Sequence, residues 1–124
     1  MVKLSVEASH EDERGSITDL LVDKEINAVT SLTLLRGAVR GNHFHRQTTQ
    51  WTLVTTGEIT YAERKGDGPL KTHVAGVGGF FVSEPGVSHA IRAESDASII
   101  VFTSGPRAGQ EYESDTFREE VALL

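Results

Sequence analysis

Short runs rich in Val, Ile, Thr, Phe or Tyr alternate with glycine-containing turns along most of this chain, and this alternation limits the fold more than any other feature. Residues of these types favour β-strands. Turn-forming residues separate the runs, as in Lys65–Pro69, Gly76–Gly79 and Glu84–Gly86. Strands are predicted over Ser16–Val22, Ala28–Leu35, Trp51–Thr55, Glu58–Arg64, Lys71–Val74, Gly79–Ser83, His89–Ala93 and Ser98–Thr103. This spacing predicts an all-β sandwich or barrel.

The chain is predicted to form one domain over residues 1–124. A chain of 124 residues is long enough to bury a hydrophobic core. The sequence shows no internal repeat, low-complexity tract or linker, and no region has helical periodicity over three turns. The tail Asp115–Leu124 is compatible with one short helix or a final extended arm.

Composition excludes several classes of function. The sequence has no cysteine, so disulfides, thiolate zinc sites and a cysteine nucleophile are excluded. Any metal must be held by imidazole, carboxylate or amide groups. The net charge of -6 argues against nucleic acid as the main partner. Met1–His10 lacks the apolar core of a signal peptide, and no stretch reaches transmembrane length, so we expect a cytoplasmic protein without a membrane partner.

Three histidines and one glutamine are the candidate functional residues. His43 and His45 stand two residues apart, so both imidazoles leave the same face of an extended strand. Gln50 leads into the next apolar run and can return across a short turn. His89 begins a later predicted strand. Three imidazoles and one amide can surround one divalent cation and leave positions open for water or substrate.

The residues around these histidines resemble the two sequence motifs of the cupin family. Residues 37–57 follow the first motif, Gly-x5-His-x-His-x4-Glu-x6-Gly, with Gln50 in place of the glutamate. Residues 78–93 follow the second motif, Gly-x5-Pro-x-Gly-x2-His-x3-Asn, except that Glu84 replaces the proline and Ala93 the asparagine. This resemblance covers nearly half of the chain and implies the cupin double-stranded β-helix, a jelly-roll barrel.

The resemblance also implies a metal site. In cupins with the complete motif, three histidines and a glutamate bind Fe, Mn, Ni, Zn or similar divalent ions. The corresponding ligands here are His43, His45, Gln50 and His89. An amide in place of a carboxylate removes one negative charge, so metal affinity should fall while a bound ion would be a stronger Lewis acid. The change favours polarising a carbonyl over activating oxygen, and it leaves open that no metal binds.

Three shorter segments are similar to cupins that act on nucleotide-linked keto-sugars. Arg40–His45 is similar to the Arg-Gly-x-His-x-His segment of dTDP-sugar 3,4-ketoisomerases and of the zinc-binding cupin domain of capsular-polysaccharide reductases. Asp12–Gly15 is similar to an Asp-x-Arg-Gly segment of rhamnose-pathway epimerases, and Asp115–Phe117 to an Asp-Thr-aromatic element of the capsular cupins. The resemblance implies an isomerase or epimerase of polysaccharide biosynthesis that moves a proton next to the carbonyl of a nucleotide-sugar.

This interpretation gives individual residues a role. His43 and His45 serve as ligands if a metal is present, and as acid and base if it is not. Arg40 can pair with a substrate diphosphate or carboxylate, or it is a surface charge. His73 is a further candidate base, with an exposed strand histidine as the alternative. Two other functions stay open: a metal-dependent dioxygenase or lyase on a small organic acid, and a non-enzymatic cupin that binds a sugar or small ligand.

The alternation of residues after Gln50 bears on oligomeric state. It places Thr52 and Val54 on the cavity side and sends Trp51 and Leu53 to the opposite face. An exposed apolar patch of this kind often marks an interface, so we expect a homodimer. The alternative is that an N- or C-terminal segment of the same chain covers this face.

Overall fold

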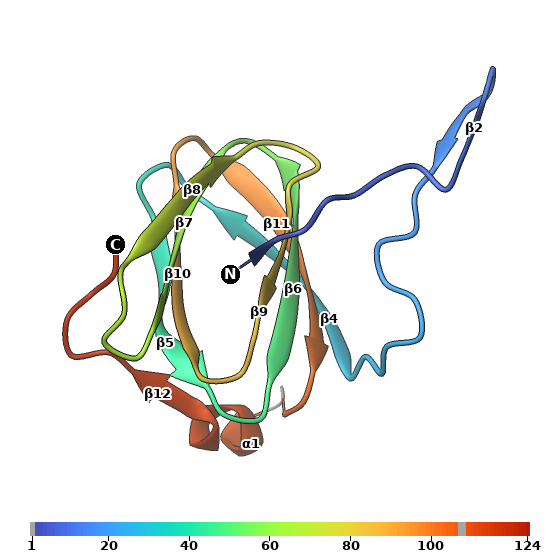
Figure 1. The fold of residues 1–124 in the computed structure, drawn as a ribbon. Coiled ribbons are helices and arrows are strands. Elements are labelled where there is room, and N and C mark those ends of the chain that lie inside the picture. Colours follow the sequence, from blue (N-terminus) through green and yellow to red (C-terminus); the bar gives the residue numbers. More distant parts are fainter. Residues whose placement is uncertain (1, 107–108) are drawn as a thin grey trace.

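Two antiparallel five-stranded sheets curve around each other to form a barrel in the computed structural model, which describes residues 2–106 and 109–124 (Figure 1). The first sheet has the order β1 (Val2–Lys3), β9 (Phe80–Ser83), β6 (Thr49–Thr56), β11 (Ala97–Ser104), β4 (Ala28–Leu34). The second has the order β12 (Thr116–Arg118), β5 (Val39–His45), β10 (Val87–Ala93), β7 (Ile59–Lys65), β8 (Lys71–Ala75). The all-β class predicted from the sequence is confirmed.

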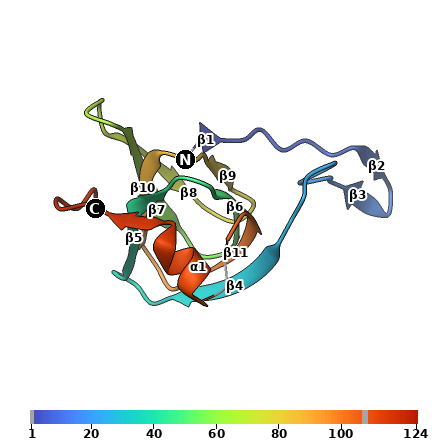
Figure 2. The same cartoon turned by 90° about the horizontal axis from the view of Figure 1, so that it is seen from below.

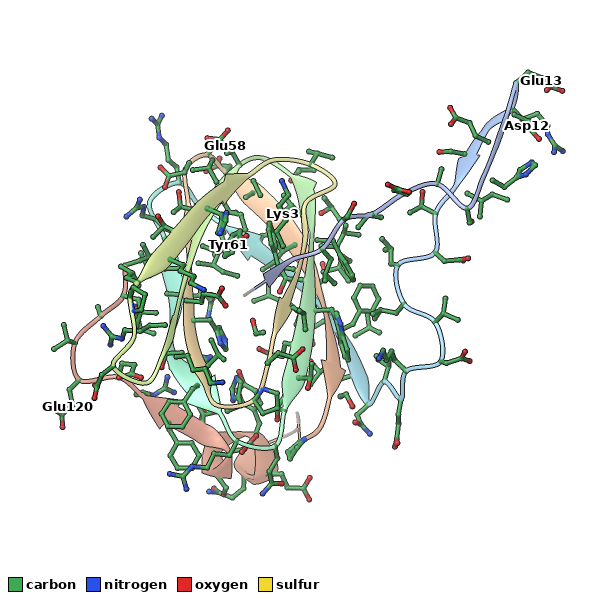
Figure 3. All side chains as sticks on the ribbon, viewed as in Figure 1. Lys3, Asp12, Glu13, Glu58, Tyr61 and Glu120 are labelled. Carbon is green, nitrogen blue, oxygen red and sulfur yellow. The ribbon has the colours of Figure 1, made fainter. Side chains whose placement is uncertain are left out.

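Two further elements lie outside these sheets. Strands β2 (His10–Asp12) and β3 (Gly15–Ile17) form a hairpin that projects away from the barrel, and Asp12 and Glu13 mark its tip in Figure 3. The helix α1 (Gly109–Ser114) lies with β12 across one end of the barrel (Figure 2). Within the described residues, no helix combines the length and the apolar composition needed to span a bilayer.

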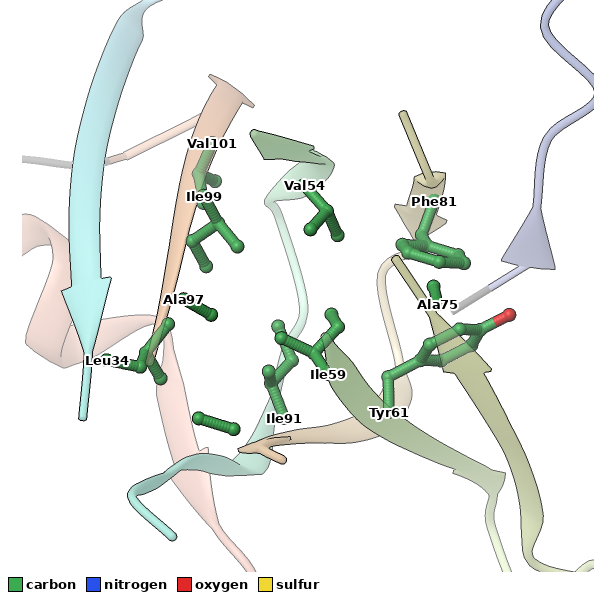
Figure 4. Close-up of a cluster of buried hydrophobic side chains, with 11 residues drawn as sticks. Leu34, Val54, Ile59, Tyr61, Ala75, Phe81, Ile91, Ala97, Ile99 and Val101 are labelled. Carbon is green, nitrogen blue, oxygen red and sulfur yellow. The ribbon is translucent and has the colours of Figure 1, made fainter. Parts of the chain in front are cut away.

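Apolar side chains from both sheets fill the end of the barrel away from α1. Ile59, Tyr61 and Phe81 are completely buried there. This inner core groups Leu34, Val54, Ile59, Tyr61, Ala75, Phe81, Ile91, Ala93, Ala97, Ile99 and Val101 (Figure 4). Because strand residues alternate between faces, polar residues at the other ends of the same strands point into the same interior.

The N-terminal segment, residues 4–26, covers part of the outer face of the first sheet. Trp51, which is only 8% exposed, packs with Phe80 and Val82. Partly buried residues packed against this group are Leu4, Val6, Leu20, Leu21, Ile26, Leu53 and Phe102. The expectation that Trp51 and Leu53 stand exposed is therefore wrong, because the chain covers them itself. The homodimer stays a prediction.

Most predicted strands lie where the sequence placed them, with two differences. The strand predicted over Ser16–Val22 ends at Ile17, because the hairpin projects away from the sheets and no further strand pairs with residues 18–22. The tail has both of its proposed forms in part: α1 precedes Asp115, and Thr116–Arg118 pairs as strand β12 with β5.

Candidate functional site

Three imidazoles meet inside the polar end of the barrel. His43 and His45 come from β5, and the register of β5 with β10 places His89 opposite His43. The ring centroids are 4.7 Å apart for His43 and His45, 4.8 Å for His43 and His89, and 5.5 Å for His45 and His89. One nitrogen from each ring lies within 4.8 Å of the others. Small side-chain adjustments would allow all three nitrogens to bind one ion.

Gly41 allows the two histidine-bearing strands to approach this closely. Its φ is +96°, and a Cβ on it would lie 2.7 Å from the carbonyl oxygen of His89. The pairing of β5 with β10 shifts register between His89 and Ala90, so Asn42 is the extra residue of a bulge. Glycine therefore fits both the backbone conformation and the contact that brings His43 next to His89.

Backbone carbonyls determine which nitrogen of two rings carries the proton. Nδ1 of His45 lies 3.1 Å from the carbonyl oxygen of Asp115, and Nδ1 of His89 lies 3.4 Å from that of Val87. Because a carbonyl only accepts, both Nδ1 atoms donate, and each neutral ring keeps its lone pair on Nε2. Nδ1 of His43 is buried without a hydrogen-bond partner among the described residues.

Burial keeps the histidines neutral. Desolvation, with smaller contributions from His43 and His45, lowers the pKa of His89 to about 3. Desolvation also lowers the pKa of His43 to about 4, with His45 and Arg118 acting in the same direction. Near neutral pH these rings are in the form that binds metal ions. The donor set therefore fits a divalent cation.

Asp115 holds the turn next to His45. Its buried carboxylate accepts hydrogen bonds from Thr48 Oγ1 at 2.6 Å and from the backbone N–H groups of Arg46 and Gln47, each at 3.0 Å. Burial by itself would raise the pKa of Asp115, but these hydrogen bonds outweigh it and the pKa is lowered. The same residue thus orders the turn with its side chain and His45 with its carbonyl.

A cavity of about 460 Å³ opens beside the histidines. Gln50 faces it, as its motif position predicts, and so does Arg40. The other lining residues are Thr30, Leu32, Val39, Gly41, His43, Thr52, Ser83, His89, Ile91, Ile99, Val101, Tyr112, Glu113, Thr116 and Arg118. The structure thus gathers His43, His89, Gln50 and Arg40 around one space, with His45 packed against both histidines.

Sequence reasoning missed the residues that α1 and β12 contribute. The Tyr112 ring lies 5.3 Å from the His45 ring and lines the cavity. Arg118 pairs with Glu113 at 3.6 Å, and both line the cavity. These residues fall outside both cupin motifs, and only the Asp-Thr-aromatic resemblance over Asp115–Phe117 pointed to this region.

His73 lies apart from the histidine cluster. It is exposed on β8 and stacks on Tyr61 at 5.0 Å, while the Tyr61 ring lies 4.0 Å from Phe81. Burial, with a smaller contribution from Glu63, raises the pKa of Tyr61 to about 12. Neither His73 nor Tyr61 is among the described residues that line the cavity.

Residues 10–117 match the family described as the polysaccharide biosynthesis C-terminal domain. The chain belongs to this family. No curated protein matches the chain. A solved 3,4-ketoisomerase from Helicobacter canadensis is 18% identical, with a TM-score of 0.77 over 94% of this chain and 89% of that one.

Two other solved structures share the fold of this family member. The sugar 3,4-ketoisomerase QdtA from Thermoanaerobacterium thermosaccharolyticum, in complex with TDP, is 18% identical, with a TM-score of 0.72 over 96% of this chain and 86% of that one. The capsular polysaccharide assembling protein CapF from Staphylococcus aureus is 20% identical, with a TM-score of 0.68 over 94% of this chain. The match spans only 35% of CapF. The predicted cupin-like jelly roll is confirmed.

Proposed function

We propose that this chain is a sugar-nucleotide isomerase or epimerase that moves a proton next to a carbonyl. The convergence of His43, His45 and His89 on a cavity that also holds Arg40 carries the proposal. The ketoisomerases with the same fold act on sugars, and one of them was solved with TDP-4-keto-6-deoxyglucose. Fold alone does not determine function, so the argument rests on the cavity.

The cavity can bind the anionic part of such a substrate. Arg40 of β5 and Arg118 of β12 both line it, on neighbouring strands of the second sheet. Guanidinium groups pair well with diphosphate oxygens because they present several N–H donors in one plane. Arg40 is the residue we assign to this contact, which would place the sugar ring toward the histidines.

The histidines have two modes of action. If an ion binds, His43, His45, His89 and Gln50 hold it, and the ion polarises the sugar carbonyl. If no ion binds, neutral His43 accepts the proton from the carbon beside the carbonyl and returns it to the neighbouring position. In either mode the apolar wall formed by Ile91, Ile99 and Val101 limits access of water to the reacting atoms.

Solvent exchange tests the proposal directly. With TDP-4-keto-6-deoxyglucose as the probe in deuterated water, deuterium should enter the carbon next to the carbonyl, and His43→Ala should lose this exchange. The matched control is His73→Ala, which removes a histidine outside the cavity and should keep it. Metal analysis of protein purified without an affinity tag distinguishes the two modes. Oxygen uptake without exchange would support a dioxygenase, and neither activity across a panel of keto-sugar nucleotides would support a binding role.

We also keep the homodimer as a proposal, although Trp51 no longer supports it. Val29, on the outer face of β4, and Leu35, just after that strand, are exposed apolar residues outside the covered part of the sheet. Sedimentation at micromolar concentration should give twice the mass of the chain. A monomeric mass would remove the dimer from consideration.

A further inference from the structure

The C-terminal tail, residues 119–124, packs against the outer face of the second sheet, behind the histidines. Leu123 is 7% exposed and packs with Ala62 of β7 and Ala90 of β10. The side chains of Ser88 and Glu119 form a hydrogen bond. The tail therefore contacts Ser88 and Ala90, the two residues that flank His89 in the chain.

Asn42 binds the same tail from the neighbouring strand. Its Oδ1 accepts hydrogen bonds from the N–H groups of Leu123 at 2.7 Å and Leu124 at 3.3 Å. Its carbonyl oxygen accepts another from the N–H of Glu119 at 2.8 Å. One residue thus holds both ends of the tail, and it directly precedes His43.

The backbone of Asn42 depends on these contacts. Asn42 has a φ of +57°, a conformation that costs free energy for residues other than glycine, although asparagine tolerates it better than most. It is the bulged residue between Gly41 and His43, so a change in its conformation moves His43 relative to His89. Bulges persist when surrounding contacts determine them, and here the tail supplies those contacts.

We propose that Asn42 and the C-terminal tail form a positioning device that sets the spacing of His43 and His89. The tail connects the outward-facing neighbours of both histidines, so its docking fixes the bulge of β5 against β10. The family match ends at residue 117, so this device lies partly outside the region shared with the family. The simpler alternative is that the tail only covers Ala62 and Ala90 and leaves the histidines unaffected.

Four variants separate these alternatives. Asn42→Gly keeps a residue that accepts positive φ but removes the side chain that binds the tail. Leu123→Asp releases the tail without touching either histidine-bearing strand, and Leu123→Met keeps the packing with similar volume. Val121→Asp is the matched control, because Val121 carries the same substitution on the same tail but is 72% exposed.

The primary readout needs neither metal nor substrate. The imidazole carbon and proton NMR signals of all five histidines report their local environment, and His10 and His73 lie outside the cluster as internal controls. Asn42→Gly and Leu123→Asp should shift the signals of His43 and His89 and leave those of His10 and His73 in place. Leu123→Met and Val121→Asp should change none of them.

A second readout uses Co²⁺ alone as the probe. Residues that orient metal ligands typically change metal affinity by about 10- to 100-fold when replaced. We expect Leu123→Asp to weaken Co²⁺ binding about tenfold and Val121→Asp to leave it unchanged. The proposal is overturned if amide signals show a mobile tail in Leu123→Asp while the signals of His43 and His89 stay at their wild-type positions. If Asn42→Gly does not fold, Leu123→Asp decides the question.

Discussion

The two ends of the barrel are equally buried but differ in chemistry. Ile59 and Phe81 at one end are completely buried and apolar. At the other end His45, Thr48 and Thr103 are at most 2% exposed and polar. Apolar contacts are non-directional, so the first end needs only matching volume, whereas each buried polar group at the second end needs a partner in the right direction.

This difference indicates where the molecule is robust and where it is exact in its requirements. A core of matching volume tolerates exchange of one aliphatic side chain for another at small cost. The polar end depends on individual atoms, such as the Asp115 carbonyl oxygen bonded to Nδ1 of His45. We therefore expect the apolar end to control stability and the polar end to control ligand binding, and the following predictions test that division.

The largest effect should come from the apolar end. Replacing Phe81 with alanine leaves a cavity beside Tyr61 and Ile59 and should lower the free energy of unfolding by about 3–5 kcal/mol. Urea denaturation measures this loss. Val77→Ala is the control, because Val77 is an exposed apolar residue whose truncation should change stability by less than about 0.5 kcal/mol. A small effect of Phe81→Ala would show that the interior is not packed as described.

A smaller loss should follow from Gly41→Ala at the junction of the two histidine-bearing strands. The new methyl group would lie 2.7 Å from the His89 carbonyl oxygen, and alanine disfavours a φ of +96°. We expect a cost of about 3 kcal/mol from strain and overpacking together. Gly66→Ala is the matched control, because Gly66 also has positive φ but nothing lies near its added Cβ, so about 1 kcal/mol is expected. Equal losses in urea would contradict the close approach of β5 and β10.

Acidification should weaken the fold through the polar end. The pKa values of His43 and His89 fall to about 4 and about 3 on folding, below the ordinary value of 6.5. Below pH 6.5 the unfolded chain therefore binds protons that the folded chain does not, and stability falls by up to about 1.4 kcal/mol per pH unit for each histidine. Lowering the pH from 7 to 5.5 should reduce the free energy of unfolding by about 2 kcal/mol. Identical urea midpoints at the two pH values would contradict this prediction.

The smallest effect concerns Gln50. Gln50→Glu places a carboxylate in the cavity and should tighten binding of a divalent ion by about tenfold, with little change in stability. His45→Ala should abolish stoichiometric binding, because one of the three converging rings is lost. Isothermal titration with Zn²⁺ measures both. If neither variant changes Zn²⁺ affinity, the histidine cluster does not bind metal.

The sequence predicted local features better than features that depend on distant segments. The cupin-like spacing of His43, His45 and His89 predicted the fold and pointed to one shared cavity, because motif residues on neighbouring strands meet by register. Strand β5 itself was harder to recognise, since Arg40, Asn42 and His43 give it a polar composition. Its extended form follows from pairing with β10 and β12 rather than from its own residues.

Contacts between distant segments were not predictable from residue patterns. Tyr112 and Arg118 reach the cavity because β12 pairs with β5, and nothing in the local sequence of α1 indicates that pairing. Leu4 and Leu20 pack near Trp51, although the apolar residues of the N-terminal segment have no helical or strand period. Such residues show their role only when the sheet they cover is already in place.

The cover over Trp51 makes the chain its own optical sensor. Trp51 is the only tryptophan, so all indole emission comes from the boundary between the first sheet and the N-terminal segment. Lifting that segment would bring water to the indole and move its emission to longer wavelength, even while the barrel stays intact. Fluorescence and far-ultraviolet circular dichroism should therefore report two separate transitions if the segment detaches before the barrel unfolds.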